Sequence, residues 1–417
     1  MTSERHVKDA LSAGMGPRGT ARWASMALVA VAASCIPPPA NRDVRGQAPV
    51  SGSLAPPLAI GPGGTGSAVV TTAAGADSAG ADAQDAVVLI VLDGVRWQDV
   101  FVGADPALAA EAGVQPLRAE ALMPNLHALV ADRGAAIGAP GQGAPMRASG
   151  PNYVSLPGYN EILSGRRVTA CKDNDCDPTR LRTIMDDARA VARRPSDVAV
   201  IASWPKIERA CSADPGSIVV SAGRTEIEHR EVFQGDPIAA GWLASGALAD
   251  PFPGYGGYRP DRYTAGLALR YLETKRPRML FLGLGEPDEY AHRDDYRGYL
   301  ESLRAADGTV GDLLATLARM GERGRRTTVL VTADHGRGRD YRVHGRNFPE
   351  SSRVWLVAAG AGIHARGFVH ATRDHHLADV APTIRTLLDL PADDSPEAGA
   401  PLDELFAPPR MQSAALP

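Results

Sequence analysis

The chain has 417 residues, of which 44% are hydrophobic and 22% charged, enough for one large core of about 300 residues. The formal net charge is only −4, with basic and acidic residues in near balance. This balance gives no electrostatic basis for binding nucleic acid or an anionic membrane surface, so nucleic acid is excluded as a predicted partner.

Residues 1–35 have the pattern of an export signal. Arg18 and Arg22 precede an apolar run at 23–33 that is too short to span a bilayer and ends in small residues. The following Ala-Ala-Ser-Cys resembles a bacterial lipoprotein signal, in which Cys35 becomes the acylated first residue. The alternatives are cleavage without lipidation and a plain disordered tail. The sequence predicts an exported bacterial protein, either periplasmic or an outer-membrane lipoprotein.

Residues 36–85 are predicted to form a disordered linker. No charged residue occurs from 46 to 76, and Ala, Gly, Pro, Ser and Thr dominate the composition. Such a segment buries too little apolar surface to offset the entropy lost on ordering, so it suits a flexible tether. Residues 393–417 are similar and are predicted to be a surface or disordered tail. Residues 86–392 are left as the folded domain.

Five short apolar runs in this domain have the length and β-branched content of strands buried on both faces: 87–92, 198–202, 279–284, 327–332 and 354–359. Helical patterns separate them, the clearest at 295–320, where apolar residues recur every three or four positions. This alternation predicts an α/β fold with a doubly wound, mostly parallel sheet and helices on both faces.

Acidic residues and histidines follow three of these strands. Asp93 comes directly after the first, Asp288 follows the third, and Asp334 with His335 follows the fourth. Ligands bind beyond the carboxyl ends of such strands, so we expect these side chains at one edge of the sheet. His292 lies four residues after Asp288, a spacing suited to two ligands of one metal. Taken singly, each of these residues could also be part of a turn, a helix cap or a surface ion pair.

Together these residues indicate a metal site. Carboxylates and imidazoles clustered at one sheet edge suit zinc, as one ion or two, and His344 follows nine residues after His335. The segment 155–165 has a loop, a short helical pattern and a glycine stop. Its Ser155 would ordinarily cap a helix. A metal that lowers the pKa of this hydroxyl would instead make it a nucleophile.

Six runs in this order resemble the alkaline phosphatase superfamily, and most closely its type I phosphodiesterase and nucleotide pyrophosphatase branch. They are VLIVLDGVR, MPNLHALVADRG, NYVSLPGYNEILSG, GEPDEYAHRDDYRGYLESLRAAD, VLVTADHGRG and VHG, within residues 86–392. The resemblance implies an alkaline phosphatase-like hydrolase domain with two divalent metal ions, zinc or manganese. One ion would be held by Asp93, Ser155, Asp334 and His335, and the other by Asp288, His292 and His344. Ser155 would attack a phosphomonoester or phosphodiester and form a phosphoseryl intermediate.

The chain departs from that branch in two places. Ser155 stands where the branch commonly has threonine. The branch also has an asparagine that contacts a phosphoryl oxygen, for which the candidates are Asn174, Asn160 and the backbone N–H of Leu156. Lys206, beside a tryptophan after the strand at 198–202, is a further candidate substrate contact, with a solvated surface lysine as the alternative.

Other functions share this fold. Sulfatases use a formylglycine made in a C/S-x-P-x-R motif, and here Tyr159 takes the arginine's place, which disfavours conversion of Ser155. Cofactor-independent phosphoglycerate mutases carry a larger insertion after the serine, and a secretion signal suits them poorly. A headgroup transferase and a surface-anchored binding protein are further alternatives, the second disfavoured by the complete ligand set. The predicted substrate is a small-molecule, lipid or nucleotide phosphate ester, and membrane contact is expected only through a lipid on Cys35.

The remaining cysteines allow one disulfide. Cys171 and Cys176 share a polar loop and would pair in an oxidising compartment or stay unpaired. Cys211 shows no metal-binding spacing with either of them.

Overall fold

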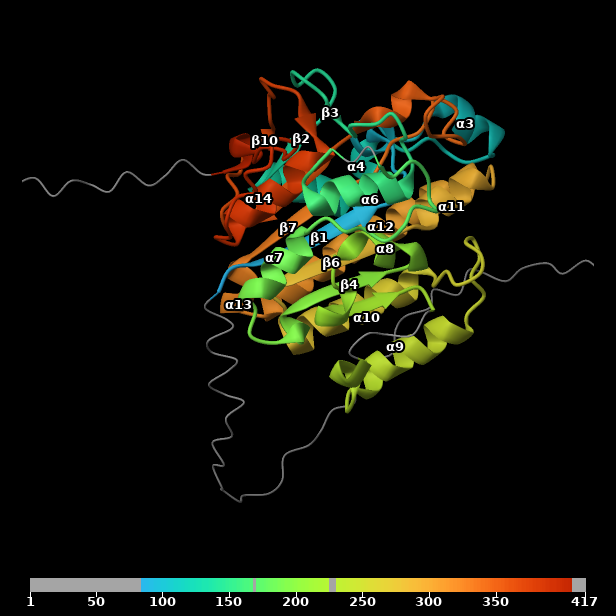
Figure 1. The fold of residues 1–417 in the computed structure, drawn as a ribbon. Helices are drawn as coiled ribbons and strands as arrows, with labels where there is room; N and C mark the ends of the chain where they lie inside the picture. The colour runs from blue at the N-terminus through green and yellow to red at the C-terminus, as the bar shows by residue number, and fades with distance from the viewer. Residues whose placement is uncertain (1–83, 168–169, 225–229, 407–417) are drawn as a thin grey trace, which may run out of the picture. The chain divides into compact units, whose positions relative to one another are not determined.

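The central strand of the fold is β1 (Ala86–Leu92), the first strand predicted from the sequence. The computed structural model describes residues 84–167, 170–224 and 230–406. In it, β1 lies inside an eight-stranded sheet (Figure 1). The strand order is β10 (Gly367–Phe368), β2 (Gly134–Ile137), β9 (Leu356–Gly360), β7 (Thr327–Thr332), β1, β6 (Met279–Leu284), β4 (Val198–Ala202), β5 (Val219–Ala222). The five strands from β7 to β5 are parallel, and β9 runs antiparallel to both of its neighbours.

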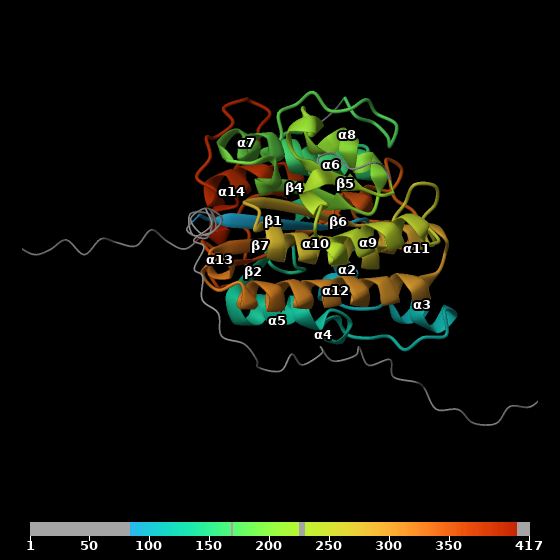
Figure 2. The same ribbon diagram turned by 90° about the horizontal axis from the view of Figure 1, so that it is seen from below.

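Helices cover both faces of this sheet (Figure 2). One face carries α6 (Ser155–Ser164), α7 (Ile184–Val191), α8 (Glu208–Cys211) and α14 (Val380–Leu387), and the other carries α5 (Pro124–Arg133), α9 (Pro237–Leu248), α10 (Asp261–Lys275) and α12 (Tyr296–Arg319). Alternate residues of β1 enter two separate apolar cores: Val88 and Ile90 pack on one side, Val87 and Leu89 on the other. A strand buried on both faces explains its unbroken apolar sequence. The predicted fold class is confirmed.

The shorter elements lie mostly in the connections. They are α2 (Trp97–Phe101), α3 (Pro106–Glu111), α4 (Ala119–Leu122), α11 (Glu286–His292), α13 (Glu322–Arg325) and the three strands of a small second sheet, β3 (Met146–Arg147), β8 (Arg353–Val354) and β11 (His375–His376). Within the described residues, no helix combines the length and apolar content that crossing a lipid bilayer requires.

The run predicted as one strand at 354–359 is divided at Trp355. Its indole N–H donates to the carbonyl of Val95 at 3.1 Å, and its own carbonyl accepts from the Thr332 hydroxyl at 2.6 Å. These contacts turn the backbone between β8, which pairs in the small sheet, and β9, which pairs in the large one. A single apolar run therefore supplies a strand to each of two sheets.

Helix α12 lies within the predicted range of 295–320, and two of its features explain why its sequence pattern predicted it. The Asp295 carboxylate accepts a hydrogen bond from the Gly298 N–H at 2.9 Å and so begins the helix. Tyr299, Leu303 and Val310 are fully buried along one stripe of its surface. The cap and the stripe together fix both the start of α12 and the face that it presents to the sheet.

The part of the predicted tail that the structure describes is packed onto the domain. Leu402 and Leu405 are fully buried, and the Gly399 N–H donates to the Gly165 carbonyl at 2.8 Å. Residues 393–400 are half-buried or exposed at the surface, and the two leucines that follow anchor the stretch to the domain. Residues 407–417, the predicted export signal with Cys35, and the linker up to residue 83 lie outside the described residues.

Candidate metal centre and nucleophile

The seven predicted ligand residues come together at the carboxyl ends of three adjacent parallel strands. Asp93 follows β1, α11 follows β6, and Asp334 and His335 follow β7. Helix α11 carries Asp288 in its first turn and ends at His292, so the two side chains share one side of it. The last two residues do not lie directly after a strand: Ser155 begins α6, and His344 lies further along the loop after β7.

Ser155 is the first residue of α6, and its hydroxyl faces the carboxylates. Its Oγ lies 3.3 Å from Asp93 Oδ1 and 3.4 Å from His335 Nε2, and the residue is only 4% exposed. The cap position belongs to Val154, which has no capping side chain. The Leu156 N–H instead donates to Asn174 Oδ1 at 2.9 Å. Because Asn174 caps this helix from a neighbouring loop, the serine hydroxyl is left for chemistry.

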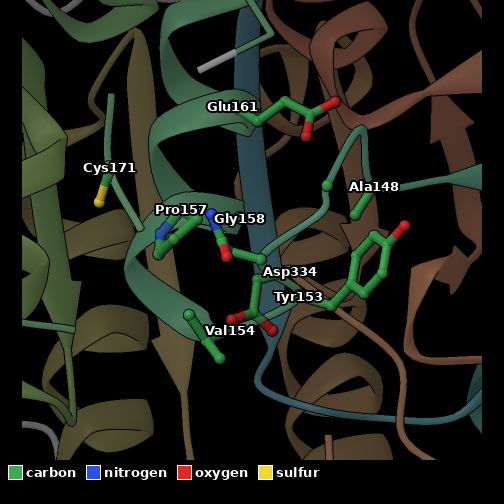
Figure 3. A pocket seen from close by; sticks show the side chains of 10 residues that line it. Ala148, Tyr153, Val154, Pro157, Gly158, Glu161, Cys171 and Asp334 are labelled. Carbon is green, nitrogen blue, oxygen red and sulfur yellow. The ribbon is translucent and has the colours of Figure 1, made fainter. Parts of the chain in front are cut away.

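A glycine lets α6 approach this edge of the sheet closely. A Cβ atom at Gly158 would lie 2.3 Å from the carbonyl oxygen of Asp334, so no larger residue fits there. Figure 3 shows Gly158 beside Asp334 and Glu161 pointing away from it. Glu161 accepts hydrogen bonds from the N–H and hydroxyl of Ser149 at 2.8 and 2.6 Å, and from the Ala378 N–H at 3.1 Å. Helix α6 therefore packs closely against Asp334 through Gly158, and the hydrogen bonds of Glu161 hold its opposite side.

Asp93, Asp334 and His335 form a buried group around Ser155. The Nδ1 atom of His335 lies 2.8 Å from the Gly336 carbonyl, so that nitrogen carries the proton and Nε2 presents its lone pair. This Nε2 lies 3.4 Å from Asp93 Oδ1 and 3.6 Å from Asp334 Oδ2. Asp334 Oδ1 accepts from the Gly94 N–H at 3.0 Å, but Oδ2 is buried without a hydrogen-bond partner in the described part of the chain.

Asp288, His292 and His344 form a second group beside the first. His292 Nε2 lies 3.0 Å from Asp288 Oδ2 and 2.9 Å from His344 Nε2. His344 uses Nδ1 to donate to the Tyr153 carbonyl at 2.9 Å, which turns its Nε2 into the site. Ligand atoms of this trio lie within 4.8 Å of one another, as do those of Asp93, Asp288 and His335, so Asp288 stands between the two groups.

The electrostatics of both groups suit cations. Burial and the neighbouring Asp288 raise the pKa of Asp93 to about 7, and burial and Asp93 raise the pKa of Asp334 well above its usual range. Burial lowers the pKa of His335 to about 4 and that of His344 to about 3, so both imidazoles are neutral near pH 7, the form that binds metals. A divalent cation would offset the carboxylate repulsion and satisfy the orphaned Asp334 Oδ2. The residues present therefore fit a metal centre.

Two residues of the site were missed by the sequence reasoning. The Arg337 guanidinium, fully buried, donates to Asp288 Oδ1 and to the Tyr341 carbonyl. Burial raises the pKa of Asp288, but Arg337 and His292 outweigh it and hold that pKa well below its usual range. No signal in a glycine-rich loop marked this arginine as buried. Tyr159, whose hydroxyl donates to Asp93 Oδ2 at 3.0 Å, lies four residues after Ser155, a helical spacing that would have revealed it.

A cleft opens in front of Ser155, with an empty volume of about 760 Å³ including its mouth. Beyond the metal-centre residues it is lined by Asn174, Trp204, Lys206, Tyr255, Tyr258, Gly285 and Glu289. Lys206 forms an ion pair with Asp175 at 2.7 Å. Two of the three predicted substrate contacts, Asn174 and Lys206, thus line the cleft. Asn160 does not, because its amide donates to the Leu156 carbonyl inside α6.

Asp261, at the start of α10, connects the carboxyl ends of two strands to α11. Its Oδ1 accepts from the Ser203 hydroxyl at 2.6 Å, the Tyr258 hydroxyl at 2.8 Å and the Gly285 N–H at 3.0 Å. Its Oδ2 accepts from the Glu286 N–H at 3.0 Å, and Glu286 Oε1 accepts from the Asp261 N–H in return. Each carboxylate thus caps the helix of the other. The start of α11, and with it Asp288, is fixed by this exchange.

We therefore expect Asp261→Asn to weaken metal binding by Asp288, His292 and His344 by about tenfold or more, as supporting residues of metal sites commonly do. Titration calorimetry with zinc measures this directly. The matched control is Asp307→Asn, because Asp307 is also buried and caps α5 through the N–H groups of Asn125 and Leu126. Equal zinc affinities in the two variants would show that Asp261 only stabilises the fold.

The comparisons with known proteins agree with this picture. Residues 263–392 match the Metalloenzyme superfamily. A curated relative, the 2,3-bisphosphoglycerate-independent phosphoglycerate mutase of a Cyanothece strain, is 32% identical over 122 residues, 27% of this chain and 22% of the relative. A candidate sulfatase from Bacteroides thetaiotaomicron has a TM-score of 0.51 at 13% identity, covering 76% of this chain and 74% of that one. A protein solved with its substrate D-glucosamine-2-N,6-O-disulfate gives 0.51 and 13%, covering 77% and 82%.

These comparisons show a Metalloenzyme superfamily match over part of the chain and a fold shared with a sulfatase-like protein, and they leave the activity open. The structural neighbours are too distant in sequence to show more than the fold. The chain spans only 22% of the length of the Cyanothece mutase that it matches. The segment 263–392 includes Asp288, His292 and His344 but not Asp93 or Ser155. The family match therefore covers one whole candidate metal-binding group and leaves out the predicted nucleophile.

Proposed function

We propose that this chain, which has the fold of the alkaline phosphatase superfamily, is a two-metal hydrolase of phosphate esters with Ser155 as its nucleophile. The observation that carries the proposal is the position of the serine hydroxyl. It lies 3.3 Å from Asp93 Oδ1 and 3.4 Å from His335 Nε2, at the base of the cleft. Nothing in its helix uses this hydroxyl, and its two hydrogen-bonding neighbours, Asp93 and His335, are of residue types that bind metals.

The residues divide the chemistry between them. Asp93, Asp334 and His335, with Ser155, would hold one divalent cation, zinc or manganese, and Asp288, His292 and His344 would hold the other. When bound, the cations supply the positive charge that favours the serine alkoxide and the developing charge of the ester. Ser155 Oγ forms a bond to phosphorus as the ester oxygen leaves with its electron pair. Water then breaks the phosphoseryl bond, which returns the hydroxyl and releases phosphate or a monoester.

The other residues of the site orient these groups. The Tyr159 hydroxyl fixes Asp93 through Oδ2, so that Oδ1 faces Ser155. Arg337 fixes Asp288 through Oδ1, so that Oδ2 faces His292. Lys206 lies in the cleft wall with its ammonium group on Asp175, and we assign it to an anionic part of the substrate. The substrate would be a small-molecule, lipid or nucleotide ester of phosphate.

A sulfatase is the second candidate on this fold, but Tyr159 argues against it. The tyrosine occupies the position of the arginine in the formylglycine motif, and here its hydroxyl bonds to Asp93. An unmodified Ser155 favours transfer of a phosphoryl group, because the serine ester of phosphate can be attacked at phosphorus by water. The matched curated mutases raise phosphoryl transfer between the hydroxyls of one substrate as a further alternative.

Hydrolysis by the zinc-loaded full chain tests the proposal. We expect turnover of nitrophenyl phosphate or bis-nitrophenyl phosphate, and a loss of at least about 10⁴-fold in Ser155→Ala, as for other covalent nucleophiles. Equal zinc content in both proteins would show that the loss of activity comes from the missing nucleophile and not from missing metal. Turnover of nitrophenyl sulfate alone would assign a sulfatase, and interconversion of phosphoglycerates without hydrolysis would assign a mutase. No reaction with metal bound would favour a binding protein or a transferase.

We also infer that the protein works outside the cytoplasm. The described structure contains a disulfide between Cys171 and Cys176, while Cys211 is a buried free thiol. Disulfides persist in oxidising compartments such as the bacterial periplasm. Together with the export pattern of residues 1–35, this supports a periplasmic enzyme or a lipoprotein acylated at Cys35. Mass spectrometry of the mature amino terminus distinguishes the two.

A further inference from the structure

Exposed apolar side chains gather in one stretch of the chain, beside the cleft of the candidate metal centre. Of the seven large apolar side chains that are exposed among the described residues, four belong to residues 237–255, the apolar segment. Two are on α9, Ile238 and Leu248, and two are on the loop after it, Phe252 and Tyr255. Leu248 is 88% exposed, and Tyr255, which is 72% exposed, also lines the cleft. The apolar segment therefore leads from α9 to the mouth of the cleft.

Helix α9 has the sequence PIAAGWLASGAL and contains no charged residue. One of its sides packs on α10, where Ala239 and Gly246 are buried and the Trp242 ring lies edge-on to that of Tyr263, with centroids 6.1 Å apart. Its other side, which includes Leu248, lies toward solvent outside α10 (Figure 1). A surface helix ordinarily has charged residues on its solvent side. An exposed helix without them indicates a surface that another apolar phase covers.

The loop after α9 is held in place although its aromatic ring at Phe252 is half exposed. The Arg293 guanidinium donates to the carbonyls of Pro253 and Gly254, the second at 3.1 Å, and lies over the Phe252 ring, 5.0 Å from its centroid. The same ring lies edge-on to Tyr290 of α11, with centroids 5.7 Å apart. Because α11 also carries two candidate metal ligands, the exposed ring is fixed relative to the cleft.

The charged groups beside the apolar segment have both signs. Arg293 attracts the carboxylate of Glu289, which lines the cleft, and Arg262 attracts that of Glu286. Asp250, between α9 and the exposed rings, is exposed as well. These groups provide no excess of positive charge that would attract an anionic membrane, in keeping with the formal net charge of −4. An apolar surface bordered by both signs matches a zwitterionic phospholipid, whose headgroup has a phosphate and an ammonium group.

We propose that the apolar segment docks on the surface of a zwitterionic phospholipid bilayer, with its four exposed apolar side chains at the boundary between headgroups and acyl chains. Leucine and aromatic side chains of helices that lie on a membrane enter this region, and tyrosine is enriched at the headgroup level. Docking places the mouth of the cleft, at Tyr255, against the headgroups. The docking requires no catalysis, whereas delivery of a lipid phosphate ester to Ser155 rests on the proposed function.

A polarity-sensitive fluorophore attached to Leu248→Cys tests the docking. The full chain also carries Cys35→Ser, so that it cannot be acylated, while a disulfide holds two of the other cysteines and the third is buried. The matched control has the label on Val191→Cys, because Val191 is 48% exposed on α7, on the other face of the sheet (Figure 2). Vesicles of phosphatidylethanolamine and phosphatidylcholine should shift the emission to the blue only for the label at position 248. The shift should persist in about 0.5 M salt, which screens charges but not apolar contact.

A second substitution in the labelled Leu248→Cys chain shows whether the loop takes part. Phe252→Ser should weaken the vesicle affinity by about tenfold, because it removes an apolar ring from the contact. Phe368→Ser is the control, since Phe368 is 45% exposed on β10, and it should change the affinity by less than about twofold.

No shift at position 248, equal shifts at both labelled positions, or equal effects of the two serine variants would overturn the proposal. A shift without vesicles that grows with protein concentration would overturn it in favour of a second copy of the chain. A shift that requires phosphatidylglycerol and disappears in salt would assign an electrostatic contact instead. None of these measurements involves turnover, so a failure of the proposed hydrolysis would be distinguished from a failure of docking.

Discussion

Asp93→Asn should reduce kcat/KM for a phosphate ester by about 1,000-fold or more, equivalent to about 4 kcal/mol of transition-state stabilisation. Asp93 contacts three groups of the site at once: Ser155 and His335 through Oδ1, and Tyr159 through Oδ2. An amide retains the shape but loses the negative charge that a cation requires. Its NH₂ group would also point a donor at either Tyr159 or the serine. Steady-state kinetics with excess zinc measures the loss.

The control for this charge change is Asp312→Asn, on the exposed side of α12. It should leave kcat/KM within about twofold, since surface substitutions away from special features are nearly neutral. Circular dichroism of Asp93→Asn should match the wild type, because the carboxylate is at the sheet edge and its desolvation cost disappears with its charge. A fully active Asp93→Asn enzyme would contradict the assignment of the first metal group.

His344→Ala should lower the bound zinc from two ions per chain to one. The variant removes one of three side chains in the group of Asp288, His292 and His344, and a site with two protein ligands holds its ion at least about 100-fold more weakly. The ring of His344 stacks on that of His335 with centroids 4.1 Å apart, so some packing is lost as well. Elemental analysis after dialysis counts the ions, and thermal unfolding with and without zinc shows whether the remaining ion stabilises the fold.

His370→Ala is the matched control, because His370 is exposed and outside both metal groups. It should keep two ions and the wild-type thermal transition. Two tightly held ions in His344→Ala would remove His344 from the ligand set. One ion in the wild type would instead show that Arg337, whose guanidinium is on Asp288, takes the place of a second cation in neutralising the site.

The strands and the clustering of the candidate ligand residues could be predicted because each has a local signal. The runs of β4, β6 and β7 were predicted with their bounds, since a strand buried on both faces has few polar residues and ends where they begin. The positions of Asp93 and Asp334 follow from the same rule, because a parallel sheet brings its carboxyl ends to one edge. Short strands such as β2, with sequence GAAI, have no such signal and pair only because the domain surrounds them.

The residues that support the candidate ligands could not be predicted from the sequence, because their roles depend on partners that are distant in the chain. Asp261 precedes Gly285 by 24 positions, and Arg337 follows Asp288 by 49. Neither separation leaves a periodic pattern. Asn174 was predicted as a candidate contact to the substrate. In the structure it accepts a hydrogen bond from Leu156, one of the other candidates for that contact, so the two candidates are bound to each other.

The disulfide of the polar loop would make the activity of the proposed enzyme depend on oxidation. Cys171 and Cys176 close a ring around Asn174, and Asn174 holds the first turn of the helix that presents Ser155. In a chain with reduced cysteines, no covalent bond would close the loop that carries this cap, and the Leu156 N–H next to Ser155 would be held less firmly. Catalytic competence would then mature only after oxidation. The proposed enzyme would then spare the phosphate esters of the compartment where it is synthesised and would act where the disulfide forms.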